Sequence, residues 1–88
     1  MSVKKHDNQP LLDALNEQLS ACCELDNRGC WILNTQMKAN QDGYRPIVKI
    51  APPPGSAYLR GSKTGMRLSS TVYSARLGIV EIEWDVMD

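Results

Sequence analysis

The chain has 88 residues, which is enough for one compact domain around one hydrophobic core. Hydrophobic residues make up 42% and charged residues 23%, a composition that excludes disordered, collagen-like and coiled-coil proteins. The formal net charge is zero, which removes the global positive field of proteins that attract nucleic acid nonspecifically. No apolar run is long enough for a membrane helix, and the first residues lack the apolar stretch of a signal peptide. We therefore expect one soluble, cytoplasmic domain.

The N-terminal part predicts one amphipathic helix over Gln9–Leu25, after a polar segment 1–8 that we expect to be flexible. Pro10 falls in the first turn, where its missing amide donor costs little. An apolar stripe recurs at helical spacing, and it consists of Leu11, Leu12, Leu15, Leu19, Cys22 and Cys23. We expect this stripe to be buried and the helix to end at 26–29, where Asn or Gly can adopt the left-handed conformation.

From Cys30 the hydrophobic pattern changes to a period of two, which predicts a strand and then a β-hairpin. The residues expected to point to one side of the first strand are Trp31, Leu33, Thr35 and Met37, and those expected on the other side are Ile32, Asn34, Gln36 and Lys38. Asn40–Gly43 supplies the turn, and the alternation resumes over Tyr44–Ile50. Pro46 has no amide to donate, so we expect the second strand to lie at a sheet edge or to turn that position outward.

The segment 51–68 is rich in proline and glycine and predicts a loop region. Three successive prolines end the preceding strand, because each of them lacks an amide donor. Ala57–Arg60 can form a short strand, and Gly61–Gly65 is typical of a flexible loop. For Leu68–Arg76 two structures stay open, because its β-branched residues favour an extended chain whereas its serines can cap one or two helical turns.

The C-terminal residues predict a strand with one apolar and one acidic face. Its apolar positions are Val80, Ile82, Trp84 and Val86, and its acidic positions are Glu81, Glu83 and Asp85. We expect the acidic face to lie beside Arg45 and Lys49, because such cross-strand pairs stabilise a sheet. The expected fold is α+β, with one N-terminal amphipathic helix packed on a three- or four-stranded, mainly antiparallel sheet in a single domain over 1–88.

Residue types that carry chemistry are sparse. Three cysteines and the lone His6 lack the paired spacing of zinc ligands, so we expect structural, reduced thiols at Cys22, Cys23 and Cys30 and no metal or cofactor. One histidine gives a hydrolase triad no plausible base, and the strand alternation explains Glu81 and Glu83 as a solvent face. We therefore expect no catalytic residues and a protein that is not an enzyme.

The basic residues are concentrated in one part of the chain, because no acidic residue lies between Asp42 and Glu81. Those in this interval are Arg45, Lys49, Arg60, Lys63, Arg67 and Arg76. One interpretation is that the acidic C-terminal strand neutralises them across the sheet. The other is a mobile basic loop that binds a partner protein, since Arg and Tyr are enriched at interface hot spots. The expected partner-binding residues are then Tyr58, Arg60, Lys63 and Arg67.

Three short motifs lie within the last two thirds of the chain. They are Gly-Cys-Trp-Ile-Leu at 29–33, Gly-Tyr-Arg-Pro-Ile-Val at 43–48 and, after a proline-rich break, Gly-Ile-Val-Glu-Ile-Glu-Trp at 78–84. With these motifs the chain resembles short uncharacterised accessory proteins that tailed phages and prophages encode. The resemblance implies a protein without chemistry of its own that binds a host or phage protein complex as an inhibitor or adaptor. It assigns no functional residue.

Two further arrangements stay open. The basic segment 45–76 supports nucleic-acid binding as the alternative function, since phosphates attract such residues. An unpaired strand edge near Arg45–Ile50 would also allow a homodimer. The identity of the protein partner, the oligomeric state and any modification of the cysteines do not follow from the sequence.

Overall fold

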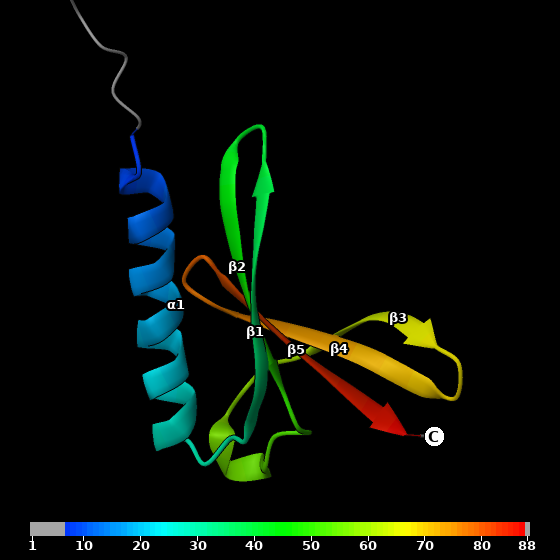
Figure 1. Ribbon diagram of the computed structural model, residues 1–88. Helices are drawn as coiled ribbons and strands as arrows, with labels where there is room; N and C mark the ends of the chain where they lie inside the picture. Colours follow the sequence, from blue (N-terminus) through cyan, green and yellow to red (C-terminus); the bar gives the residue numbers. More distant parts are fainter. Residues whose placement is uncertain (1–6, 88) are drawn as a thin grey trace, which may run out of the picture.

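The computed structural model describes residues 7–87 and contains one helix and a five-stranded mixed sheet (Figure 1). The elements are α1 (Gln9–Asn27), β1 (Ile32–Asn40), β2 (Gly43–Ile50), the short 3-10 turn η1 (Gly55–Ala57), β3 (Ser62–Arg67), β4 (Ser70–Leu77) and β5 (Val80–Met87). The strand order is β1-β2-β5-β4-β3, and β2 and β5 are the parallel neighbours. The α+β class is confirmed. The sheet differs in detail from the predicted three or four, mainly antiparallel strands, because it has five strands and includes one parallel pair. Most of the polar segment expected to be flexible, and with it His6, lies outside the described residues.

Helix α1 begins and ends close to the predicted positions. The Asp7 carboxylate accepts a hydrogen bond from the backbone amide of Gln9 at 3.0 Å, ahead of the proline in the first turn. At the other end Gly29 has a φ of +81°, and the amide of Cys30 donates to the carbonyl of Leu25 at 2.9 Å. A glycine in the left-handed region therefore closes the helix, as the sequence predicted.

The face that α1 buries differs from the predicted one. The helix residues that the structure buries are Ala14, Gln18, Ala21 and Leu25. Three of the leucines expected in the core, Leu12, Leu15 and Leu19, are exposed, and we call them the leucine ridge. The small alanines let the helix approach the sheet closely, and the Gln18 side chain bonds to strand backbone, so the sheet contacts the neighbouring flank of the predicted stripe.

Strand β1 contains an irregularity that changes which side chains face the core. The pairing of β1 with β2 shifts register between Ile32 and Asn34. Thr35 and Met37 share one face as predicted, but the bulge removes Trp31 and Leu33 from that face and leaves both exposed. Ile32 packs against the core instead. A bulge adds one residue to one strand, so the period-two pattern loses phase across it.

Strand β2 lies inside the sheet, between β1 and β5. The predictions of an edge position for Pro46 and of an unpaired edge at Arg45–Ile50 were therefore wrong. Pro46 is buried, and the parallel pairing with β5 begins only at the next residue, Ile47. An interior strand tolerates the proline here because the ladder on that side has not yet started.

The region 56–76 is more regular than predicted. Ser62–Arg67 forms the edge strand β3, so the predicted loop over Gly61–Gly65 was wrong, and of the two structures left open for 68–76 the extended one is observed as β4. All six residues of β3 are exposed. An edge strand with two exposed faces has no alternation of apolar and polar residues, which is the signal a sequence offers.

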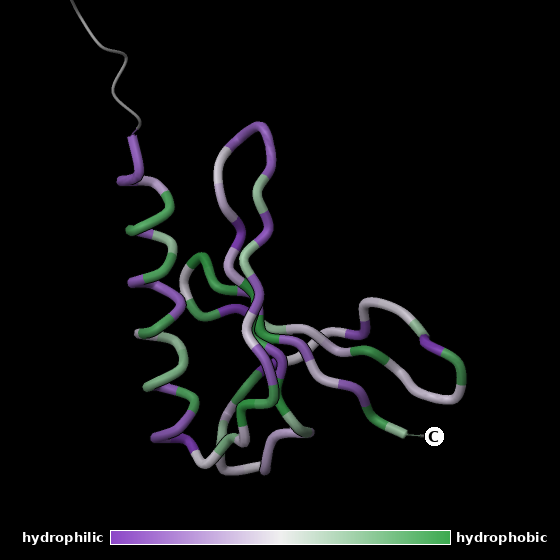
Figure 2. Tube along the Cα trace, in the orientation of Figure 1, coloured by the Kyte–Doolittle hydropathy of each residue, from purple (hydrophilic) through white to green (hydrophobic). Residues whose placement is uncertain are grey.

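The hydrophobic core lies where β2 and β5 run side by side beneath α1. Val48, Val80 and Ile82 are fully buried there, and Trp84 stacks on Tyr73 with ring centroids 6.1 Å apart. The apolar face predicted for the last strand is thus confirmed over 80–84. Figure 2 shows the same arrangement, with hydrophobic chain where the strands cross and a hydrophilic tip on the β1–β2 hairpin.

Candidate functional site

The face of the sheet opposite α1 carries the acidic side chains of β5, each within an ion pair. Arg45 of β2 bonds Glu81 at 3.2 Å, and Lys49 lies 3.6 Å from Asp85. Arg67 of β3 reaches Glu83 at 3.5 Å and Asp85 at 3.8 Å. The expected neutralisation of β5 by Arg45 and Lys49 is confirmed, and Glu81 and Glu83 each face a guanidinium from a different strand.

These ion pairs divide the basic residues into two groups. Arg45, Lys49 and Arg67 are occupied by β5, and Arg28 pairs with Glu24 within one turn at 2.9 Å. Within residues 7–87, the cations that form no ion pair are Lys38, Arg60, Lys63 and Arg76. Of the four predicted partner-binding residues, Arg67 therefore acts within the sheet, whereas Arg60 and Lys63 keep their charge for an external group.

The segment 57–61 alternates between side chains that face the core and side chains that face solvent. Ala57 is fully buried and Leu59 packs against the core cluster, whereas Tyr58 and Arg60 are exposed. A Cβ on Gly61 would overlap the ring of Trp84, so the chain passes directly over that ring. The segment is thus held against the core by Ala57, Leu59 and Gly61, while the side chains of Tyr58 and Arg60 point into solvent.

A side chain of α1 also holds this segment. The Arg28 guanidinium donates a hydrogen bond of 3.3 Å from Nη1 to the carbonyl of Ala57, 29 residues along the chain. The predicted mobile loop is therefore attached to the helix and to the core at successive residues. An attached loop loses less conformational freedom when it binds a partner.

Strand β3 places Lys63 and Arg67 on opposite faces of the sheet. Lys63 pairs with Tyr73, whose ring lies on the face that bears α1, and Arg67 pairs with Ser70 on the other face. A bulge between Lys63 and Gly65 separates the two. Tyr58, Arg60 and Lys63 are thus exposed in succession along the chain, and the fourth predicted residue, Arg67, lies on the opposite face from Lys63.

Two exposed apolar residues extend this region, and the sequence analysis missed both. Met66 pairs with Thr71 on the face of Tyr73, and Leu68 in the β3–β4 turn is 99% exposed. We call Tyr58, Arg60, Lys63, Met66 and Leu68 the hairpin surface. Leu68 stands between Arg67 and two serines, a pattern that indicates an exposed turn. The sequence analysis missed this turn because it predicted a loop, and not a strand, over the preceding residues.

The backbone of the hairpin surface is strained at two positions. Tyr58 has a φ of +54° and Leu68 a φ of +53°, and they are the non-glycine residues with positive φ in the described chain. The left-handed region costs roughly 1–2 kcal/mol for a residue with a Cβ. Tyr58 is 86% exposed, and together with Leu68 it presents the two most exposed large apolar side chains of residues 7–87. Strain and apolar exposure therefore coincide at these two positions.

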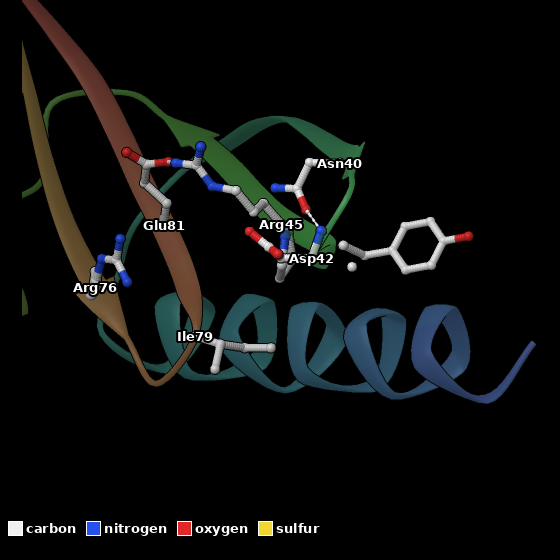
Figure 3. Close-up of a pocket in the computed structure, with 9 residues that line it drawn as sticks. Asn40, Asp42, Arg45, Arg76, Ile79 and Glu81 are labelled. Carbon is white, nitrogen blue, oxygen red and sulfur yellow. Dashed lines mark hydrogen bonds and ion pairs between the residues drawn. The ribbon is translucent and has the colours of Figure 1, made fainter.

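A cavity of about 380 Å³ lies elsewhere, beside the β1–β2 turn and the start of β5 (Figure 3). Figure 3 shows the Arg45 side chain extending to Glu81 across this cavity, while Asn40 accepts a hydrogen bond from the amide of Asp42. Arg45, Glu81 and the Asn40 side-chain oxygen are thus engaged within the wall of the cavity. Arg76 also lines it, as a guanidinium without an ion pair among the described residues.

The three cysteines are free thiols. Burial raises the pKa of the Cys22 thiol, with a smaller contribution from Cys23, and burial also raises the pKa of Cys30 against the opposing charge of Arg28. Both thiols are therefore protonated at neutral pH, which makes them poor nucleophiles. In the described part of the chain, no three Cys, His, Asp or Glu side chains converge as metal ligands would.

Comparison with protein families, with curated proteins and with solved structures yields no match to the chain. The likeness to phage and prophage proteins therefore stays a prediction. Within residues 7–87 the one helix is not apolar enough over its length to span a bilayer.

Proposed function

We propose that this chain is a small, non-enzymatic accessory protein of the kind that phages and prophages encode, and that it binds a host or phage protein complex in the cytoplasm as an inhibitor or adaptor. The observation that carries the proposal is the coincidence of backbone strain and apolar exposure at Tyr58 and Leu68. Strain at an exposed residue lowers the stability of the free protein and is retained where a bound state needs that geometry.

The hairpin surface has the composition of an interface hot spot. Tyr58 and Leu68 offer apolar contact area, and Arg60 and Lys63 offer cations that no described carboxylate neutralises. Tyrosine supplies a large contact area for the loss of only two side-chain torsions. The partner that fits is a protein with an apolar pocket for an aromatic ring and carboxylates at its rim.

Nucleic-acid binding through 45–76 is less well supported than protein binding. Its electrostatic basis was six cations, of which Arg45, Lys49 and Arg67 are occupied by the acidic residues of β5. The three that remain are divided between the hairpin surface and the cavity lined by Arg76. Fewer phosphate contacts mean weaker binding with a shallower dependence on salt.

The test uses variants that separate binding from folding. Tyr58→Gly/Leu68→Gly removes both apolar side chains and relieves both strained positions, so we expect equal or higher stability together with loss of the partner. Arg60→Ala/Lys63→Ala removes the two free cations, and Lys38→Ala/Arg76→Ala is its matched control, because it removes the same charges elsewhere. Tagged proteins are purified from the native host with nuclease, and the bound proteins are quantified.

A stoichiometric protein that survives nuclease, and that is lost from the first two variants but kept by the control, supports the proposal. Full recovery of that protein by the glycine variant contradicts the assignment of the surface. Recovery dominated by nucleic acid, with a steep loss on added salt, contradicts the proposal and favours the alternative.

A further inference from the structure

The face of the sheet opposite α1 carries more cations than the carboxylates of β5 neutralise. Its carboxylates are Glu81, Glu83 and Asp85. The cations of the described strands that share this face are Lys38, Arg45, Lys49, Arg67 and Arg76. Five cations against three carboxylates leave an excess of two positive charges on this face, although the formal net charge of the whole chain is zero.

Two of these cations stand directly opposite each other. Lys38 of β1 and Arg45 of β2 are register partners in the antiparallel ladder. Arg45 has a carboxylate partner in Glu81 at 3.2 Å, whereas Lys38 forms no ion pair within residues 7–87. Like charges that stand opposite each other destabilise a sheet. Lys38 therefore brings a positive charge that the fold does not use and that an added anion would offset.

Lys38 lies at the wall of a cavity of about 180 Å³ on this face. The cavity is lined by Gln36, Lys38, Ile47, Lys49, Arg67 and Glu83. Ile47 is the apolar residue of this set and is only 5% exposed, so the long polar side chains surround an apolar floor. Its three cations and one carboxylate give the cavity two excess positive charges. Charges interact more strongly beside such an apolar surface than in bulk water.

The two cations of the cavity that have carboxylate partners keep donors for a further anion. Lys49 lies 3.6 Å from Asp85, and Arg67 lies 3.5 Å from Glu83 and 3.8 Å from Asp85. Close charge-assisted hydrogen bonds are about 2.7–2.9 Å long, so these contacts are loose. An ammonium and a guanidinium also have more N–H donors than these contacts use. An anion in the cavity therefore reaches all three cations without displacing the carboxylates of β5.

We propose that this cavity binds the terminal phosphoryl group of a phosphate monoester or of free phosphate, with Lys38, Lys49 and Arg67 as the donors. Such a group carries about two negative charges at neutral pH, which matches the excess charge of the cavity. It also has enough acceptor oxygens to bond each of the three cations. The cavity has the volume of about six water molecules in the liquid, which is room for a phosphoryl group and a small substituent.

The backbone of a nucleic acid matches this cavity less well than a terminal phosphoryl group does. Each phosphodiester carries one negative charge, which is half the excess charge of the cavity. Two of its four oxygens are also esterified, so fewer of them accept hydrogen bonds. The expected order of affinity is therefore monoester or free phosphate first and diester well below.

A titration of the unmodified protein, followed by the NMR signals of its amides, tests the site directly. The probes are inorganic phosphate, methyl phosphate and dimethyl phosphate, at constant ionic strength and about pH 8, where a monoester is a dianion. We expect saturable shifts confined to the cavity residues with the first two probes, and binding at least about fivefold weaker with dimethyl phosphate. Tighter binding of methyl phosphate than of phosphate identifies a monoester as the source, and the reverse order identifies free phosphate.

Two outcomes of this titration would overturn the proposal. One is a set of shifts that do not saturate or that spread evenly over the charged surface, which is the behaviour of nonspecific ion association. The other is dimethyl phosphate binding as tightly as methyl phosphate, because the cavity would then not select a doubly charged group.

A matched pair of variants tests the role of Lys38. Lys38→Gln removes a cation of the cavity and is expected to weaken methyl phosphate binding by at least about fivefold. Arg76→Gln removes an exposed cation from the same face that does not line this cavity, so it is expected to bind methyl phosphate like the unmodified chain. Equal binding by the two variants contradicts the proposal.

Thermal unfolding separates lost binding from lost folding. Lys38→Gln also removes the like charge opposite Arg45, so this variant is expected to be at least as stable as the unmodified chain. The cavity and the hairpin surface share no residue. Failure of the phosphoryl site therefore leaves the proposed protein-binding function untouched, and failure of that function leaves the phosphoryl site untouched.

Discussion

The contact between Gly61 and Trp84 yields a prediction in which two opposing effects are separable. Replacing Gly61 with alanine places a methyl group into the ring of Trp84. The ring cannot move aside freely, because it is stacked on Tyr73 and only 6% of the residue is exposed. Overpacking of this kind costs roughly 1–3 kcal/mol.

The opposing effect is that alanine restricts the unfolded chain, which stabilises a protein by about 0.4–1 kcal/mol where the backbone tolerates the residue. Gly61 does not have a positive φ, so its backbone accepts alanine. The net expectation for Gly61→Ala is a loss of about 1–2 kcal/mol, taking both effects together. At about 4–8 °C per kcal/mol for a domain of this size, the melting temperature falls by roughly 5–15 °C.

Gly55→Ala is the matched control, because a Cβ there meets no atom within 4 Å and the φ of Gly55 is not positive. It is expected to leave stability unchanged or to raise it by up to about 1 kcal/mol. Thermal and urea unfolding, followed by circular dichroism and tryptophan fluorescence, measure both variants. If Gly61→Ala is as stable as Gly55→Ala, the segment 57–61 does not pass over Trp84, and the argument that Tyr58 and Arg60 are held in place fails.

Three further predictions concern the core, the helix end and the thiols. Ile82→Ala empties a fully buried position on β5 and is expected to cost about 2–5 kcal/mol, whereas Ile82→Val costs about 0.5–1.5 kcal/mol, both measured by urea unfolding. Gly29→Ala forces a Cβ into the left-handed conformation that ends α1, so a loss of about 1 kcal/mol is expected, and an unchanged unfolding midpoint would contradict that geometry. Because burial raises the pKa of Cys22 and Cys30 above the usual 9.0, the unfolded chain ionises first, and stability is expected to fall as the pH rises above about 9. Cys30→Ala should reduce that fall, and a stability independent of pH between neutral pH and about 10 would refute the assignment.

The elements that the sequence predicted well have local signals. The end of α1 followed from Gly29, and the β1–β2 hairpin followed from the Asp-Gly pair at 42–43. The burial of Val80, Ile82 and Trp84 followed from strict alternation. In each case the deciding residues lie within a few positions of the feature that they determine.

The buried flank of α1 was not predictable in the same way. The apolar stripe is wide, and periodicity identifies the stripe without showing which of its edges meets the sheet. The side of the stripe that meets the sheet is the one with Ala14 and Ala21, where small side chains allow close approach. Gln18 is buried on the same side because its side chain donates hydrogen bonds to two strand carbonyls. That choice depends on where the strands lie, which is a non-local property.

Only part of the candidate site was predictable, because the rest of it also depends on non-local structure. Composition indicated a basic segment near Tyr58, but the ion pairs that occupy Arg67 depend on the order of strands in the sheet. The strain at Tyr58 and Leu68 has no counterpart in residue type, since neither residue favours a positive φ. The sequence thus indicated the basic region around Tyr58. Which of its residues are free to bind a partner depends on the order of the strands in the sheet.

The parallel junction between β2 and β5 has a consequence for how the chain folds. The register pairs Ile47–Lys49 with Glu81–Glu83, and it joins a unit made of α1 and the first hairpin to a unit made of β3, β4 and β5. Each unit is built from neighbours in the sequence, whereas the junction closes a loop from Ile50 to Val80, which costs entropy before any contact forms. We therefore expect the docking of the two units to be the slow step of folding. Because the same short ladder carries the fully buried Val48 and Ile82, the two units are expected to open together, and amide exchange of β5 would then report unfolding of the whole domain.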